Sequence, residues 1–245
     1  MKAIQSFVVI LLAVLLLGCE QQNQEIIVGT SADNPPYEFI QNGEIVGMDI
    51  DIINAIAAHI NKKIIIKNLD FPGLLAALAS KNIDIAIAAL SVTLERSKVV
   101  DFSYTYMVSN VSVLYREVDN FNNYNNLENK TVGVQVGSTW ALIAEDLSKE
   151  LNLKINSLAN NLMLVEELKS KVVDAVILEE EQCKKFIKQN PELSDFSMPE
   201  SFSSKFAIAM QKDSQLKIDI DNAIAYLKKN GALDKIERKW ISNVR

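Results

Sequence analysis

Short apolar segments alternate along the chain with segments of helical periodicity. Apolar, β-branched runs predict strands at 26–30, 63–69 and 83–89, and helical patterns predict helices between them at 49–60 and 72–80. This strand-helix-strand-helix-strand order favours a parallel sheet with right-handed crossovers. The run 83–89 is almost wholly apolar, which is typical of a strand covered on both faces. The first part of the chain therefore predicts an α/β unit.

The second part of the chain repeats this alternation. An extended run at 108–116 is long enough to leave one compact unit and enter another, and an asparagine-rich stretch at 120–129 indicates a loop. The remaining predicted elements are strands at 131–136, 172–178 and 206–210 and helices at 140–151, 179–189, 214–229 and 232–240. After a predicted leader, about 225 residues can bury the cores of one or two domains.

The N-terminal segment predicts export from the cytoplasm. An apolar run of eleven residues at 7–17 is too short for a membrane span, which needs roughly 20 residues. Residues 1–18 are therefore predicted to be a signal peptide and 19–24 a short tether. The sequence LLGC at 16–19 resembles a bacterial lipobox, which implies lipidation of Cys19, a place in the periplasm or cell envelope and, with Glu20, no retention at the inner membrane. An ordinary cleaved signal is the alternative.

Charge, cysteine and histidine content exclude several classes of function. Without Lys2, the chain carries 24 Lys and Arg against 31 Asp and Glu, and this net charge of −7 disfavours nucleic acid or anionic lipid as a partner. With Cys19 acylated, Cys183 has no partner for a disulfide and is interpreted as a packing residue rather than a reactive thiol. His59 is the single histidine, so neither a zinc site nor any other cofactor is predicted.

Polar residues after the run 83–89 form the first candidate site. In open α/β sheets, ligands bind outside the carboxyl ends of strands, which is where Ser91, Thr93 and Arg96 are expected. A guanidinium can grip a carboxylate through two parallel hydrogen bonds, and short hydroxyl residues beside it leave backbone N–H groups accessible. These residues suggest half of a site for a free carboxylate. Alternatively, Ser91 and Thr93 cap the following helix and Arg96 is a solvated helix residue.

The second α/β cycle offers further candidates. Ser138 or Thr139 lies where a strand gives way to a helix, so N–H groups there can meet an anion, although simple capping gives the same pattern. Glu179 follows a predicted strand and is either a partner for a cation or one of three consecutive acids favoured in the first turn of a helix. Asp33 and Glu38 could also receive a cation, but the proline-rich loop hides their direction.

A series of different short motifs is spread over nearly all of residues 25–240. They lie at 29–30 (GT), 36–39 (PYEF), 47–51 (GMDID), 71–78 (FPGLLAAL), 90–96 (LSVTLER), 99–103 (VVDFS), 132–134 (VGV), 137–139 (GST), 173–176 (VDAV), 230–231 (NG) and 239–240 (KW). In this order the chain resembles the polar amino-acid binding proteins of ABC transporters, the family that includes histidine-, glutamine- and arginine-binding proteins. The resemblance implies an α/β, bilobed periplasmic binding protein fold of type II, with two lobes joined by two hinge strands.

The resemblance also implies a role for each residue around the ligand's charged groups. Arg96 would be the bidentate partner of the α-carboxylate, helped by the N–H groups of Ser91 and Thr139. The Ala89 carbonyl, the Ser91 hydroxyl and Glu179 would receive the α-ammonium group. The ligand would then be held by opposite charges on its two sides.

The expected subsite for the ligand side chain departs from the family pattern. Phe71 would pack on that side chain, but an aromatic residue usually stands at the position of Asn34 and forms the second wall. Its absence argues against an aromatic clamp around arginine. Ser31 stands where some relatives have an acid, and Glu179 is one methylene longer than the commoner aspartate. Arginine or another basic amino acid is favoured over glutamine.

Family topology predicts how the two units are arranged. It implies a first lobe of residues 25–109 and 204–245 and a second lobe of 110–203 inserted into it. One amino acid would bridge Arg96 and Glu179, so its binding would favour the closed arrangement of the lobes. The predicted function is that of a monomeric binding protein, not an enzyme, which delivers a free amino acid to a membrane permease. An amino-acid sensor and a cyclohexadienyl dehydratase are the alternatives on the same fold.

Overall fold

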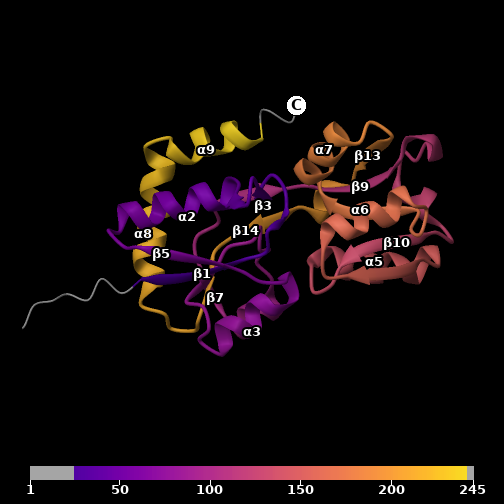
Figure 1. Ribbon diagram of the computed structural model, residues 1–245. Helices are drawn as coiled ribbons and strands as arrows, with labels where there is room; N and C mark the ends of the chain where they lie inside the picture. The colour runs from indigo at the N-terminus through magenta and orange to yellow at the C-terminus, as the bar shows by residue number, and fades with distance from the viewer. Residues whose placement is uncertain (1–24, 242–245) are drawn as a thin grey trace, which may run out of the picture.

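The computed structural model describes residues 25–241, which form two α/β lobes (Figure 1). The predicted signal peptide at 1–18, the tether at 19–24 and the lipidation residue Cys19 lie outside the described residues. The colours of Figure 1 show that one lobe holds the early and late parts of the described chain, and the other lobe its middle part. Between residues 25 and 241, no helix has the length and apolar character needed to cross a membrane.

The first lobe is built on a five-stranded sheet in the order β5-β1-β6-β15-β7. These strands are β1 (Ile26–Thr30), β5 (Ile64–Asn68), β6 (Ile85–Ala86), β7 (Asp101–Phe102) and β15 (Ala209–Met210). The helices that pack on its two faces are α2 (Met48–His59), α8 (Leu216–Lys229) and α9 (Ala232–Trp240) on one side and α3 (Leu74–Ala79) on the other. A small antiparallel sheet is formed by β2 (Asp33–Asn34), β3 (Glu38–Gln41) and β4 (Glu44–Val46).

The second lobe repeats this three-layer design around a sheet in the order β11-β10-β12-β9-β13. These strands are β9 (Val111–Arg116), β10 (Thr131–Gln135), β11 (Lys154–Leu158), β12 (Ala175–Glu179) and β13 (Leu193–Ser197). Its helices are α5 (Thr139–Leu151) on one face and α6 (Asn161–Lys169) and α7 (Glu180–Gln189) on the other. Helix α5 buries Trp140, Ala144 and Leu147, a spacing that places one apolar stripe against the sheet.

Strands β5, β1 and β6 pair in parallel, as the sequence pattern predicted. Both sheets are nevertheless mixed, because β15 in the first lobe and β9 in the second run antiparallel to their neighbours. Strand β9 begins opposite Glu179, at the carboxyl end of β12, and β15 begins opposite Ala86, at the carboxyl end of β6. Each of these strands follows a crossing between lobes and therefore starts at the edge that faces the other lobe. It then runs away from that edge, antiparallel to the strands that end there. The connection between the lobes thus accounts for the reversed strands.

Two short strands connect the lobes, as the fold prediction required. They are β8 (Met107–Ser109) and β14 (Ser204–Phe206), which pair antiparallel with Ser109 opposite Ser204. The extended run predicted at 108–116 is interrupted at Asn110, between β8 and β9. The predicted lobe boundaries at 109/110 and 203/204 adjoin the ends of the two hinge strands; as domain limits they stay a prediction.

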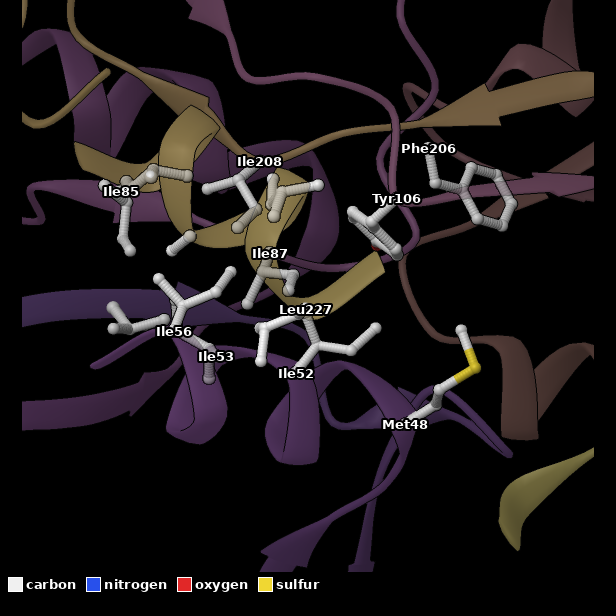
Figure 2. Packing of buried hydrophobic residues seen from close by; sticks show 14 of the residues in the cluster. Met48, Ile52, Ile53, Ile56, Ile85, Ile87, Tyr106, Phe206, Ile208 and Leu227 are labelled. Atoms are coloured by element: carbon white, nitrogen blue, oxygen red, sulfur yellow. The ribbon is translucent and has the colours of Figure 1, made fainter. Parts of the chain in front are cut away.

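The core of the first lobe is rich in isoleucine. Figure 2 shows Ile52, Ile53 and Ile56 of α2 packed toward Leu227 of α8 and Ile87, and all five side chains are almost fully buried. The spacing of the three α2 residues puts them on one face of that helix. Burial of each such side chain contributes about 1.5–3 kcal/mol, so this contact fixes α2 against the sheet.

Three local features differ from the sequence-based expectations. The strand predicted at 83–89 is reduced to β6, because Ala89 adopts a positive φ of 44° that turns the chain. The segment predicted as a loop at 120–129 contains a short 3-10 helix at Tyr124–Leu127, with Leu127 buried. The elements β2 to β4, β11, α6 and β13 were not anticipated, because most of them are short or lack a clear apolar alternation.

Gly47, immediately before α2, is expected to be intolerant of any side chain. Its φ is 140°, and a Cβ atom there would lie 2.1 Å from the Tyr37 carbonyl oxygen. We expect Gly47→Ala to lower the free energy of unfolding by about 2–5 kcal/mol, because backbone strain and overpacking add. Urea unfolding measures this effect. Gly43→Ala is the matched control: Gly43 also has a positive φ, but a Cβ there meets nothing within 4 Å, so about 1 kcal/mol is expected. Equal losses for both variants would contradict the prediction.

Candidate functional site

A cavity lies between the two lobes, and side chains from both of them line it. Its lining residues are Asn34, Phe71, Ala88, Ala89, Ser91 and Arg96 from the first lobe and Gln135, Ser138, Thr139, Trp140, Asn161 and Glu179 from the second. Eight of the residues singled out from the sequence are among them, namely Asn34, Phe71, Ala89, Ser91, Arg96, Ser138, Thr139 and Glu179. The two charged members, Arg96 and Glu179, come from different lobes.

Arg96 belongs to the short helix α4 (Leu94–Ser97) and is held by its backbone and its side chain. Thr93 caps this helix, because its Oγ1 accepts the Arg96 N–H at 3.1 Å. The guanidinium donates to the Ser91 carbonyl oxygen at 2.8 Å and, across the cleft, to the Gly137 carbonyl oxygen at 2.9 Å. The side chain is therefore not a solvated helix residue, as the alternative interpretation proposed.

The electrostatic environment of Arg96 suits an anionic partner. Arg96 is only 9% exposed, and burial lowers its pKa to about 10, which leaves it charged at neutral pH. In the described part of the chain, its guanidinium donates hydrogen bonds to two carbonyl oxygens, and no carboxylate lies within ion-pair distance. A buried cation that has only neutral partners is strongly stabilised when a carboxylate pairs with it.

The turn at 88–91 carries the chain from β6 into the cavity wall. Ala89 is held at its positive φ by Asp49, whose Oδ2 accepts the Ala89 N–H at 2.7 Å. A positive φ is uncommon for a residue with a Cβ atom and is tolerated where the surroundings fix it. Two residues later, the Ser91 hydroxyl lies 3.2 Å from the Thr139 hydroxyl of the other lobe.

The opposing wall is the N-terminus of α5. Gly137 turns the chain with a φ of 76°, and the Ser138 hydroxyl accepts the Ala141 N–H at 3.1 Å. Ser138 therefore caps the helix, as the simpler interpretation held, and also lines the cavity. Thr139 is the first residue of the helix, where backbone N–H groups and the helix dipole favour a negative group.

Glu179 ends β12 and is 3% exposed. It precedes α7 but its side chain makes no capping hydrogen bond, so the first-turn interpretation does not describe it. Burial raises its pKa to about 8, and the charges of Asp49 and Asp33 act in the same direction, while a hydrogen bond from Trp140 opposes the rise. A carboxyl group in this setting is stabilised in its ionised form by an incoming cation.

The rest of the cavity combines two aromatic rings with three amides. The aromatic residues are Phe71, whose ring centroid lies 5.6 Å from the Arg96 guanidinium carbon, and Trp140. Asn34 donates its Nδ2 to Glu38 Oε1 at 2.9 Å. The Oδ1 atoms of Asn34 and Asn161 are both buried and have no hydrogen-bond partner among the residues that the structure describes. Buried carbonyl oxygens of this kind are acceptors available to a donor group.

Two of the predicted site residues lie beside the cavity rather than in its lining. Thr93 caps α4, as described above, and Ser31 donates its hydroxyl to Asp33 Oδ1 at 3.0 Å. Asp33 forms hydrogen bonds across the cleft. Its Oδ2 accepts the Asn161 N–H at 2.7 Å and the Gln135 side-chain N–H at 3.3 Å. No group of three or more His, Cys, Asp or Glu side chains in residues 25–241 is placed to hold a metal ion.

Comparison with known proteins identifies the group to which this architecture belongs. The model of the family described as bacterial extracellular solute-binding proteins, family 3, matches residues 26–243. The chain belongs to this family. Its bilobed fold, its cavity between the lobes and its paired hinge strands are consistent with capture of a solute between two closing halves.

The solute-binding protein is similar to several arginine-binding relatives. It is 34% identical to the arginine-binding extracellular protein ArtP of Bacillus subtilis over 227 residues, which cover 92% of this chain and 89% of that protein. The arginine-, lysine-, histidine-binding protein ArtJ of Geobacillus stearothermophilus superposes with a TM-score of 0.84 at 30% identity, over 89% of this chain and 96% of that one. An ancestral arginine-binding protein bound to arginine gives 0.83 at 35% identity, over 88% and 97%. These relatives are named as binding proteins, and the chain is a binding protein rather than an enzyme.

Sequence reasoning missed four lining residues of this solute-binding protein: Ala88, Gln135, Trp140 and Asn161. Two of them lie at the carboxyl ends of strands, the position from which Ser91 was predicted. Gln135 ends β10, and Asn161 begins α6 soon after β11 ends. Trp140 follows directly after Thr139 and could have been found from its place in the first turn of α5. Asn161 carried no usable signal, because β11 itself was not anticipated.

Proposed function

We propose that this protein captures a free amino acid, and arginine in particular, in the cavity between its lobes. The single observation that carries the proposal is that a buried guanidinium, Arg96, and a buried carboxyl group, Glu179, line one cavity from different lobes. An α-amino acid offers a carboxylate to the first and an ammonium group to the second. Ser91 and Ala89 would assist at the first lobe, and Thr139 at the second, where backbone N–H groups support the carboxylate.

The choice of arginine rests on the amide and aromatic residues of the cavity lining and on the relatives. Asn34 and Asn161 offer unpartnered amide oxygens, while Phe71 and Trp140 offer apolar ring surface. A guanidinium presents five N–H donors and a flat face that stacks on aromatic rings, so it suits both features. Relatives named for arginine binding, such as ArtP of Bacillus subtilis, support the same choice. Phe71 and Trp140 would supply the aromatic surface that the family usually obtains in part from the position of Asn34.

The proposal extends to where the protein works and what it meets. We infer that residues 1–18 direct export, that Cys19 is lipidated, and that the mature protein is a monomer anchored in the cell envelope. Its partner would be the membrane permease of an ABC transporter, which would receive the amino acid from the closed form. The acidic net charge of the chain disfavours direct adsorption to anionic lipid, so the anchor would supply the membrane contact.

A thermal-shift screen of the twenty amino acids tests the ligand assignment. Arginine at about a hundredfold excess over its Kd stabilises the native state by about 2.7 kcal/mol, which raises Tm by about 5–10 °C in a chain of this size. Lysine and histidine should give smaller shifts, and acidic amino acids none. A larger shift with glutamine than with arginine would reassign the ligand, and no shift with any amino acid would overturn the proposal.

A further inference from the structure

Two fully buried carboxyl groups lie behind the cavity wall without being part of its lining. Glu38 is the first residue of β3 and Asp49 lies in the first turn of α2, and both side chains are 0% exposed. Asp49 belongs to the segment 47–51, whose close packing on Tyr37 makes Gly47 necessary. The amino-acid site described above does not use either carboxyl group. Their burial without a salt bridge therefore needs its own explanation.

The two carboxyl groups lie close together, and each has one oxygen without another hydrogen-bond partner in the described chain. Glu38 Oε1 accepts from Asn34 Nδ2 at 2.9 Å, and Asp49 Oδ2 accepts from the Ala89 N–H at 2.7 Å and the Tyr106 hydroxyl at 2.9 Å. The remaining oxygens, Glu38 Oε2 and Asp49 Oδ1, are buried and have no other donor among residues 25–241, while the two side chains lie within hydrogen-bond range of each other. Two ionised carboxylates cannot bond in this way, but one proton between them satisfies both oxygens.

The groups around this pair give it no positive charge. The titratable side chains that face it in the described structure are Asp33 in β2, Tyr37 beside β3 and Tyr106 before β8, with Glu179 farther off at the end of β12. All of these are acids or phenols. Burial raises the pKa of Glu38 well above its usual range, and it raises that of Asp49 only to about 6 because three hydrogen bonds support its charge. Glu38 is therefore the protonated member and Asp49 the ionised one.

The pair connects two parts of the cavity wall. Asn34, bonded to Glu38, and Ala89, bonded to Asp49, both line the cavity. Ala89 also holds a positive φ, which the 2.7 Å bond to Asp49 fixes. Tyr106, the third group bonded to Asp49, directly precedes the hinge strand β8. A change in either carboxyl group would thus affect Asn34 and Ala89 in the cavity wall and, through Tyr106, the hinge strand β8.

We propose that Glu38 and Asp49 share a single proton and act as positioning residues for the amino-acid site, Glu38 donating to Asp49 and Asp49 fixing the Ala89 turn. This role rests on the proposed function, because it assigns a task to residues that touch no ligand. One proton at this point orients both Asn34 and Ala89. The pair is neither a ligand contact nor a metal site.

The shared proton should be visible in how the stability of the ligand-free protein changes with pH. The pKa of Glu38 is raised on folding from 4.5, so the stability it contributes is complete below that value and is lost as the pH rises toward its folded pKa. At a pH above the pKa of Asp49, about 6, and below the raised pKa of Glu38, the folded parent binds one proton more than the unfolded chain at this pair. Each pH unit then lowers the folding equilibrium constant by an extra tenfold.

Amide substitutions test the proton directly. Glu38→Gln keeps a donor toward Asp49, and Asp49→Asn keeps acceptors for Ala89 and Tyr106 while donating to an ionised Glu38. We expect each single variant to fold and to lose the extra tenfold per pH unit in urea unfolding between about pH 6.5 and 8. The double variant sets two N–H donors against each other and should be less stable than the two single effects predict. Parallel pH profiles for parent and Glu38→Gln, or additive effects in the double variant, would overturn the proposal.

Ligand binding tests the positioning role. We expect both single variants to bind arginine within about threefold of the parent and the double variant to bind at least tenfold more weakly. Ile224→Val, which removes a buried methylene group from α8, is the control for lost stability and should leave Kd unchanged. A double variant with parental Kd would overturn the positioning role. If the parent bound no amino acid, the proposed function would fail, while the unfolding profiles would still decide whether the proton is shared.

Discussion

Arg96→Ala is expected to weaken arginine binding more than a hundredfold. The guanidinium is buried, donates hydrogen bonds to the carbonyl oxygens of Ser91 and Gly137 and has no carboxylate within ion-pair distance in the described chain. A ligand carboxylate would therefore be its ionic partner. Removing one member of a buried charge pair costs about 3–5 kcal/mol, because the other charge is left buried without a partner. Isothermal titration calorimetry with arginine measures the loss.

Arg96→Lys distinguishes the charge from its geometry. An ammonium group keeps the positive charge but cannot offer two parallel N–H groups to a carboxylate, so we expect binding at least tenfold weaker than in the parent. Arg238→Ala, at an exposed position in α9, is the matched control and should bind as the parent does. If Arg96→Ala retained parental affinity, the α-carboxylate would have another receptor and the site would be wrongly assigned.

The second large effect is expected at Glu179, in the pH dependence of binding. Its raised pKa of about 8 means that the carboxyl group of the ligand-free protein is mostly protonated at neutral pH. An ammonium group binds the ionised form, so binding releases a proton and affinity increases with pH, by up to tenfold per unit below about pH 8, with a plateau above. Calorimetry in buffers of different ionisation enthalpy measures the released proton as well as Kd.

Glu179→Gln removes this dependence together with the charge. We expect a flat pH profile and, at pH 8, a loss of at least a hundredfold, because the ligand ammonium group would be buried without its counter-charge. Glu150→Gln, at an exposed position near the end of α5, is the control and should keep the parental profile. A parental protein whose affinity did not change between pH 6 and 8 would show that Glu179 does not receive the ammonium group.

Which parts of the candidate site could be predicted follows from how each residue is positioned. Ser91, Arg96 and Glu179 were found because they follow short buried strands, and strand ends in an α/β sheet meet at one edge. Thr139 was found from the helix start that follows β10. The family resemblance added that these positions surround one ligand, an inference that strand ends alone would not support, because they lie in different lobes.

The remaining features depend on contacts that no local pattern encodes. Asp33 accepts two hydrogen bonds from the other lobe, and the partner residues, Gln135 and Asn161, lie more than a hundred positions away in the sequence. Glu38 and Asp49 are acids in a polar-looking stretch, and only the packing of β3 on α2 brings both to zero exposure. The sequence therefore predicts the charged ends of the cavity better than its walls.

The paired hinge strands have a consequence for how the molecule can move. A single connecting peptide would let one lobe twist, slide and tilt against the other. Here β8 and β14 form an antiparallel ladder of three residue pairs, from Ser109 opposite Ser204 to Met107 opposite Phe206. Such a ribbon resists twisting and sliding but bends with little resistance. We therefore expect the distance between the lobes to be the main coordinate that changes when a ligand binds, and a docking partner could sense that distance.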